Sequence, residues 1–214
     1  MLVILKKRKS NVFTIISNLE KRKSASCRMK VLLINLYSTP DKFKKKKLNF
    51  IRIFKNRAKL VIKNWQDKKG IIKEIKKGNV DRIILSGSDF RIKKTNKGIV
   101  PDEVFTSKIK TLGICYGFQY MIYYYSSLRN IKSFKNHQYD LSFRINKPFK
   151  VKKTNYRFNH HDFIVKLPKN WKTAIKYKNM IYMAYDRFGN VGTQFHPEFH
   201  KQSSNLFFNY FFCN

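Results

Sequence analysis

Residues 113–119 read Gly-Ile-Cys-Tyr-Gly-Phe-Gln, and this stretch decides the fold. An apolar run from Thr111 leads directly into Cys115, and apolar residues at helical spacing follow it as far as Leu128. The pattern predicts a strand, a sharp turn and a helix, with the thiol on the turn. A glycine stands two residues to either side of the cysteine, and neither carries a Cβ that would obstruct a tight bend. We therefore predict a nucleophile elbow, with Cys115 at a helix N-terminus that favours a thiolate.

A free cysteine is often only a small buried apolar residue, but a second stretch favours a catalytic role. Residues 194–198 read Gln-Phe-His-Pro-Glu. A cysteine nucleophile needs a base, and the base needs a group that holds its tautomer and orientation. Residues two apart in an extended segment point to the same side, so His196 and Glu198 are predicted to serve Cys115 together. With 12 Asp and Glu against 47 Lys and Arg, a chance carboxylate beside that histidine is correspondingly rare.

The two motifs together resemble the signatures of class-I, triad-type glutamine amidotransferases, in the family's order and separation. The resemblance runs from Met29 to the C-terminus. It implies hydrolysis of L-glutamine by the triad Cys115, His196 and Glu198, without a cofactor. It also implies an α/β fold of the flavodoxin-like kind: a doubly wound, mostly parallel sheet flanked by helices, with a small antiparallel sheet.

The order of elements along the chain predicts the same fold class. Apolar runs predict strands buried on both faces at residues 31–37 and 82–85. Helical spacing predicts helices at 48–65 and 71–77, and a last helix capped by Ser203 or Ser204. Further strands are expected, antiparallel ones within 130–156 and others at 163–168, 180–185 and 191–195, with a hairpin loop at 186–190.

Residues 86–89, Ser-Gly-Ser-Asp, follow the second buried strand. They occupy the place of the family's Ser-Gly-Gly-Pro loop, which implies that Gly87 lies against the substrate. By the same resemblance the backbone N–H groups of Ser88 and Tyr116 hold the oxyanion of the tetrahedral intermediate. Ser88 stands where the family has glycine. If position 88 requires a positive φ, serine strains the loop.

Residues 158–162, Phe-Asn-His-His-Asp, resemble the Ser-His-Gly-Asp segment of GMP-synthase-type glutaminase domains. The resemblance implies that Asn159, His160 and Asp162 bind the α-amino and carboxylate groups of glutamine. Gln119 is expected to assist from the elbow helix. The adjacent histidines could otherwise ligate a metal, but no further ligands occur at suitable spacing, so we expect no metal site.

The ammonia acceptor is less sharply indicated. The chain ends soon after Glu198 and has no phosphate-binding glycine-rich loop, so we expect a separate synthase subunit. Tyr116, the His160–Asp162 segment and residues 167–168 favour GMP synthase, and hence purine biosynthesis. Residues 192–194 also occur in the imidazole-glycerol-phosphate synthase subunit, and anthranilate and aminodeoxychorismate synthase subunits stay open.

Two functions of other classes also remain open. One is a stand-alone hydrolase resembling γ-glutamyl peptidases, and the other is a catalytically retired basic binding protein on the same fold. A net charge of +35 would attract nucleic acid as a partner. We favour a general bias of the composition toward lysine as the explanation of this charge, because no nucleic-acid-binding motif or compact arginine cluster occurs.

Bulk properties limit the remaining possibilities. The 214 residues suit a single domain, residues 29–214, preceded by a basic extension at 1–28 that we expect to be disordered. No apolar run reaches the roughly 18 residues of a membrane span. Three cysteines are too few for a disulfide framework, which indicates a reducing, cytoplasmic setting.

Overall fold

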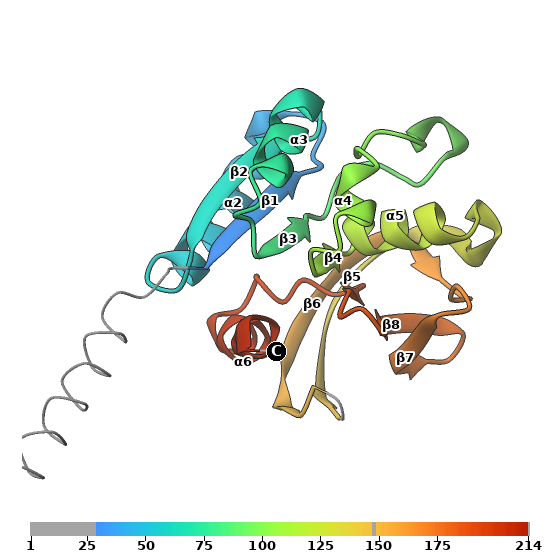
Figure 1. Ribbon diagram of the computed structural model, residues 1–214. Helices are drawn as coiled ribbons and strands as arrows, with labels where there is room; N and C mark the ends of the chain where they lie inside the picture. The colour runs from blue at the N-terminus through green and yellow to red at the C-terminus, as the bar shows by residue number, and fades with distance from the viewer. Residues whose placement is uncertain (1–28, 147–148, 214) are drawn as a thin grey trace, which may run out of the picture.

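The candidate site lies at the carboxyl ends of the parallel strands, which form one half of the sheet. A computed structural model describes residues 29–146 and 149–213 (Figure 1). The parallel strands lie in the order β2 (Lys59–Asn64), β1 (Lys30–Asn35), β3 (Arg82–Leu85), β4 (Thr111–Ile114) and β9 (Val191–Thr193). The chain winds to one side of β1 first and then to the other, so its direction reverses between β1 and β3. Ligand sites of open α/β sheets lie at the carboxyl ends of strands beside such a reversal.

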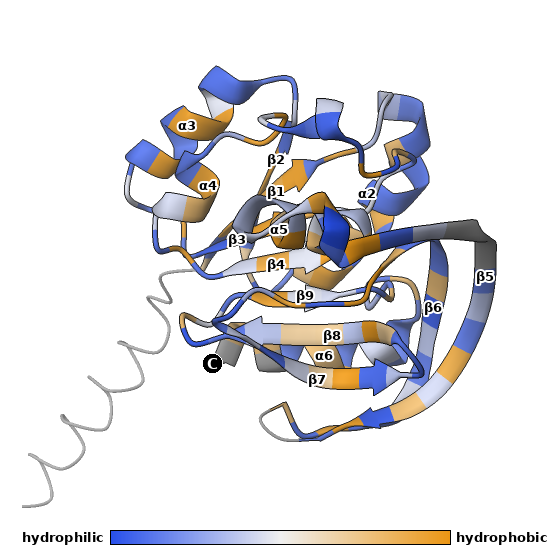
Figure 2. Ribbon diagram, turned by 90° about the vertical axis from the view of Figure 1, so that its right-hand side faces the viewer, coloured by the Kyte–Doolittle hydropathy of each residue, from blue (hydrophilic) through white to orange (hydrophobic). Residues whose placement is uncertain are grey.

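The antiparallel strands continue the same sheet. β8 (Met180–Asp186) pairs antiparallel with β9 and leads on to β6 (Val151–Ile164) and β5 (Ile131–Ile145), while β7 (Trp171–Tyr177) pairs with β8. The long β5–β6 hairpin curves away along one edge (Figure 2). The predicted α/β fold class is confirmed, although the antiparallel part is joined to the parallel part through β8 and β9.

Helices cover both faces of the parallel strands. α2 (Pro40–Phe54) and α6 (Lys201–Cys213) pack on one face, whereas α3 (Lys68–Lys76), α4 (Glu103–Thr106) and α5 (Tyr116–Tyr125) pack on the other. Two short 3₁₀ turns, η1 (Lys94–Asn96) and η2 (Leu128–Asn130), lie in the connections.

Strand β1 shows why its sequence is apolar without interruption. Val31 and Leu33 enter the core beneath α2 and α6, and Leu32 and Ile34 enter the core beneath α3 and α5, all without solvent exposure. Alternate side chains of a strand point to opposite faces, so a strand covered on both sides needs an apolar residue at every position.

One predicted helix is wrong. Residues 48–65 do not form one helix, because α2 begins at Pro40, after the N-cap Thr39, and ends at Phe54. The second half of the predicted helix is strand β2, which pairs in parallel with β1. Its centre, Leu60-Val-Ile, is rich in β-branched residues that suit a strand, and the match to helical spacing was coincidental.

Smaller differences occur near other element ends. The elbow helix α5 ends at Tyr125, before Leu128, and the last strand, β9, ends at Thr193. Strand β7 was not predicted, and the strand expected at 163–168 is only the end of β6, at Ile164.

The predicted serine cap of the last helix is also wrong. Ser203 and Ser204 lie inside α6, and their hydroxyls donate to the carbonyls of Pro197 and His200. They therefore bond carbonyls rather than the free N–H groups that an N-cap satisfies. The predicted extension at residues 1–28 lies outside the described residues. Among the helices that the structure describes, none has both the length and the apolar composition needed to cross a bilayer.

Candidate active site

Cys115 lies at the predicted turn between β4 and α5. Its backbone has φ +50° and ψ −105°, so the left-handed strain falls on the cysteine itself. A hydrogen bond of 2.6 Å from its N–H to the Thr193 carbonyl ties the turn to β9. Gly117 is needed for close packing, because a Cβ there would collide with the carbonyl oxygen of Leu85. The turn holds Cys115 at the carboxyl end of β4.

His196 reaches the cysteine from the end of β9. Its Nδ1 lies 2.8 Å from Oε1 of Glu198, and both side chains are buried. Its backbone N–H donates to the Arg157 carbonyl at 2.8 Å, which fixes the segment against β6. The side chains of His196 and Glu198 lie on the same side, but through a turn at Pro197 rather than through an extended strand, and their joint action on Cys115 stays a prediction.

The surroundings of His196 favour its charged form. Burial alone would lower the pKa of His196, but the charge of Glu198 and hydrogen bonds to Cys115 and Glu198 raise it to about 10. An imidazolium beside a thiol stabilises the thiolate, which is the nucleophilic form of cysteine. The arrangement can therefore support nucleophilic attack and then deliver a proton to a leaving group.

Gly87, in the loop of residues 86–89, lies directly against His196 and Cys115. A Cβ added to Gly87 would lie 2.9 Å from Cε1 of His196 and 3.8 Å from Cβ of Cys115. Ser88 is not among the residues with positive φ, so the strain foreseen for serine at this position is absent. Within residues 29–146 and 149–213, the backbone N–H groups of Ser88 and Tyr116 have no hydrogen-bond acceptor. Two free donors thus lie on the segments flanking Cys115.

A buried amide network lies beneath the thiol. Gln194 donates from Nε2 to Sγ of Cys115 at 3.5 Å and accepts from Nε2 of Gln119 at 3.3 Å. The same nitrogen of Gln119 donates to the Asp162 carbonyl at 2.6 Å. The side-chain nitrogen of Gln119 is therefore already hydrogen-bonded within the protein, and its predicted contact with substrate stays a prediction. Gln194 belongs to the quoted motif, but sequence reasoning gave it no role.

The predicted substrate segment lies on β6, and its members differ in setting. Asn159 reaches the site through its carbonyl, which accepts from Sγ of Cys115 at 3.5 Å, while its side chain is exposed. His160 is buried between the Tyr139 hydroxyl, 3.3 Å from its Nε2, and the Asp162 carbonyl, 3.1 Å from its Nδ1. The Asp162 carboxylate accepts from the Ile92 N–H and from the Ser133 hydroxyl. The structure thus brings the segment to Cys115 with two of its three side chains engaged within the protein.

The expectation that the His160–His161 pair holds no metal stays a prediction. Across the part of the chain that the structure describes, no three His, Cys, Asp or Glu side chains gather closely enough to hold a metal ion.

Comparison with known proteins identifies the family. The family model described as "Glutamine amidotransferase class-I" matches residues 40–213. This chain belongs to that family. Among solved structures, this amidotransferase is similar to "Trypanosoma brucei CTPS - glutaminase domain with bound acivicin", with a TM-score of 0.63 and 12% identity over 85% of this chain and 91% of the other. At that identity the likeness shows the fold alone.

Curated relatives of this amidotransferase are named "GMP synthase [glutamine-hydrolyzing]". One from Wigglesworthia glossinidia brevipalpis is 29% identical over 174 residues, which is 73% of this chain and 33% of the relative. One from Borreliella burgdorferi (strain N40) is 32% identical over 133 residues, 59% of this chain and 26% of the relative. The amidotransferase thus spans about a third or less of the length of these relatives.

Tyr37 lies beside the candidate site of this amidotransferase, and sequence reasoning missed it. It was assigned only to the apolar run of β1, but it follows the carboxyl end of that strand, where sites collect. Its hydroxyl lies 3.4 Å from the position that a Cβ on Gly87 would take. Burial, followed by the charges of Glu198 and Cys115, raises the pKa of Tyr37 above its ordinary value. Its position after a buried parallel strand was the signal that could have found it.

Proposed function

We propose that this amidotransferase hydrolyses L-glutamine to glutamate and ammonia, with Cys115 as nucleophile, His196 as acid and base, and Glu198 as the group that orients His196. The observation that carries the proposal is the position of His196: its Nδ1 bonds Glu198, and its ring and Cys115 both lie against Gly87, at the carboxyl ends of two neighbouring parallel strands.

In the first half-reaction the Cys115 thiolate attacks the side-chain carbonyl carbon of glutamine. The carbonyl oxygen becomes negatively charged, and the free N–H groups of Ser88 and Tyr116 stabilise it. When the intermediate collapses, the carbon–nitrogen bond breaks. The protonated His196 gives its proton to the nitrogen, so ammonia leaves and a γ-glutamyl thioester remains.

In the second half-reaction water replaces ammonia. Neutral His196 takes a proton from the water as it attacks the thioester carbon, and the same two N–H groups hold the oxygen again. The carbon–sulfur bond then breaks, which releases glutamate and returns the Cys115 thiolate beside a protonated His196. Glu198 keeps the imidazole in one orientation through both steps, since its carboxylate accepts from Nδ1.

Substrate binding is proposed for the surfaces around the thiol. Gly87 leaves room for the glutamine side chain where a Cβ would meet His196. Asn159, whose carbonyl accepts from Cys115 and whose side chain is exposed, is proposed to contact the α-amino and carboxylate groups. Gln119, His160 and Asp162 are proposed to complete this wall, either by direct contact or by holding β6 in place through their buried hydrogen bonds.

The proposed destination of the ammonia is a GMP-synthase-like synthase domain or subunit. Similarity to glutamine-hydrolysing GMP synthases over 73% and 59% of this chain supports this choice. Because the matched region is only part of those proteins, the acceptor reaction is proposed by similarity alone.

Ammonia release from L-glutamine by the purified chain, beside Cys115→Ala, tests the proposal. We expect release by the wild type and none by the variant. If neither chain releases ammonia, a glutamine analogue with a chloromethyl ketone in place of the amide should still label Cys115 in preference to the other cysteines. Absence of that labelling too would contradict the proposal, and faster turnover of γ-glutamyl peptides than of glutamine would indicate a stand-alone hydrolase.

A further inference from the structure

The loop that presents the Ser88 N–H has little backbone support of its own. The last strand contact is the hydrogen bond from the Ser86 N–H to the Ile34 carbonyl, and the Ser86 carbonyl accepts from the Gly117 N–H on the elbow side. In the described part of the chain, residues 87–90 make no backbone–backbone hydrogen bond. The position of the Ser88 N–H therefore depends on side-chain contacts.

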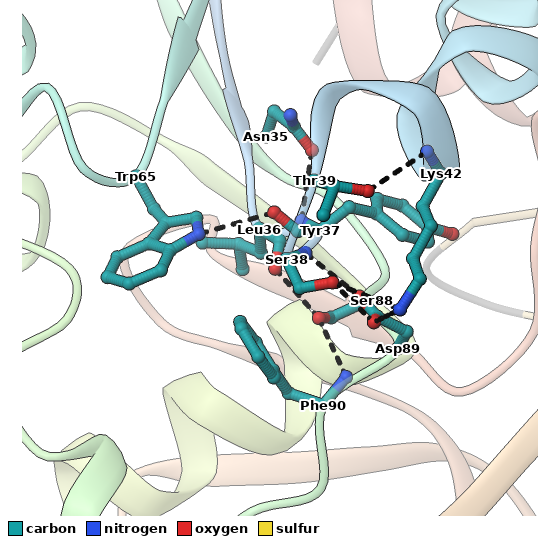
Figure 3. Close-up of polar contacts among 10 residues, drawn as sticks. All are labelled: Asn35, Leu36, Tyr37, Ser38, Thr39, Lys42, Trp65, Ser88, Asp89 and Phe90. Atoms are coloured by element: carbon teal, nitrogen blue, oxygen red, sulfur yellow. Dashed lines mark hydrogen bonds and ion pairs between the residues drawn. The ribbon is translucent and has the colours of Figure 1, made fainter.

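Serine side chains attach this loop to the end of β1. The Ser86 hydroxyl accepts from the Leu36 N–H at 2.9 Å, and the Ser88 hydroxyl donates to the Leu36 carbonyl at 2.7 Å (Figure 3 shows the second contact). The Ser88 hydroxyl also accepts from the Phe90 N–H at 3.0 Å. A glycine at position 88 would make neither of the two hydroxyl contacts.

Asp89 attaches the loop to the start of α2. Oδ1 accepts from the Ser38 N–H at 2.9 Å, and Oδ2 accepts from the Ser38 hydroxyl at 2.6 Å and from Nζ of Lys42 at 2.5 Å. Figure 3 shows the three donors converging on this carboxylate. The contacts join segments about fifty residues apart, so they fix the loop relative to the sheet rather than its local shape.

We infer that Asp89 is a positioning residue for the oxyanion site: its contacts with Ser38 and Lys42 hold the Ser88 N–H where the substrate oxygen develops charge. This inference rests on the function proposed above and adds a residue that touches neither substrate nor thiol. The two positions at which the loop departs from the family's glycine and proline, 88 and 89, are the two whose side chains attach it to β1 and α2.

The carboxylate is charged throughout the range in which the enzyme would be assayed. Burial alone would raise the pKa of Asp89, but hydrogen bonds from Lys42 and Ser38 lower it to about 2. The attachment is therefore intact at any pH at which His196 and Cys115 operate, and its loss on mutation should not depend on pH.

Asp89→Ala tests the inference, and Asp186→Ala is the matched control. Asp186 also holds a loop through three hydrogen bonds, from the Phe188 N–H, the Asn190 N–H and the Asn190 side chain, but at the other end of β9. We expect Asp89→Ala to lower kcat for ammonia release by roughly 10- to 100-fold, since removal of an oxyanion donor lowers it by about 10²–10³-fold. KM should stay within about twofold, and Asp186→Ala should lower the melting temperature without lowering kcat.

Two alkylating reagents separate the oxyanion site from the thiol. Addition of Cys115 to the carbonyl of the glutamine chloroketone places negative charge on an oxygen, whereas displacement of iodide from iodoacetamide does not. Asp89→Ala should therefore slow labelling by the chloroketone by about tenfold and leave labelling by iodoacetamide unchanged. Ser38→Ala removes only one of the three donors to Asp89. It should slow labelling by the chloroketone in the same way, but by a smaller factor than Asp89→Ala.

The outcomes separate this inference from the proposed function. If the wild type shows neither ammonia release nor selective labelling of Cys115, the proposed function fails. If the wild type is labelled normally and the ratio of the two labelling rates is the same in Asp89→Ala and Asp186→Ala, the positioning role alone is overturned.

Discussion

Nδ1 of His196 lies 2.8 Å from Oε1 of Glu198, across a single turn at Pro197 that both residues flank. The pair is almost entirely excluded from solvent. A buried histidine would ordinarily be neutral, and here the adjacent carboxylate reverses that preference. The same contact that orients the proposed base also decides its charge.

Glu198→Gln should remove a pH dependence of stability. The folded-state pKa of His196 is raised from 6.5 to about 10, so its proton stabilises the fold fully below about pH 6.5, and this contribution is lost as the pH rises through about 10. The melting temperature of the wild type should fall more between about pH 7 and pH 10 than that of the variant. The variant should also lose activity, on the order of 100-fold in kcat. Identical pH profiles of unfolding would show that Glu198 does not control the charge of His196.

Gly87→Ala should damage activity more than stability. The added Cβ would lie 2.9 Å from Cε1 of His196, so the imidazole must move, and a small displacement of a reacting group can lower the rate by roughly 10²-fold. Gly98→Ala is the opposite control: nothing lies near its Cβ, but its φ of +78° strains any side chain. We expect kcat to fall only in Gly87→Ala and the melting temperature to fall mainly in Gly98→Ala. Unchanged kcat in Gly87→Ala would mean that His196 has room to shift.

The elbow could be predicted because it is encoded locally. The apolar run, the flanking glycines and the following helical spacing all lie within residues 111–128, and each favours the same turn. Strand β2 could not be predicted in this way. Its residues fit either period, and only parallel pairing with β1, formed by segments about 30 residues apart, makes the strand the stable choice.

Contacts between distant segments explain what else the sequence did not reveal about the site. The concern over Ser88 assumed a backbone shape that no local signal specifies, whereas its hydroxyl bonds Leu36, 52 residues away. The predicted substrate segment on β6 was placed in the site by resemblance. Its burial pattern, which turns His160 and Asp162 inward and Asn159 outward, depends on how β6 pairs with β5 and β8.

Cys115→Gly should be at least as stable as Cys115→Ala. Glycine in place of alanine ordinarily destabilises a fold by about 0.5–1 kcal/mol, but a non-glycine residue held at a left-handed φ carries about 1–3 kcal/mol of strain. Because Cys115 has a φ of +50°, the strain relieved by glycine should exceed the ordinary cost of glycine by about 1 kcal/mol. Ala174→Gly, within strand β7, shows the ordinary cost. Urea unfolding of the three variants compares them, and a loss in Cys115→Gly relative to Cys115→Ala as large as that in Ala174→Gly would mean that the elbow is unstrained.

Tyr37→Phe should weaken turnover of glutamine while leaving the fold intact. The Tyr37 hydroxyl lies beside Gly87, and because burial and the charges of Glu198 and Cys115 raise its pKa, it is a neutral donor at any assay pH. A donor beside the site can bond the bound substrate, and loss of one such bond should lower kcat/KM by about 3- to 10-fold. Tyr156→Phe is the matched control, because its buried hydroxyl has no partner among the described residues. Equal kcat/KM in the two variants would exclude Tyr37 from the substrate site, whereas a fall confined to Tyr37→Phe would add the end of β1 to the ends of β3, β4 and β9 that form it.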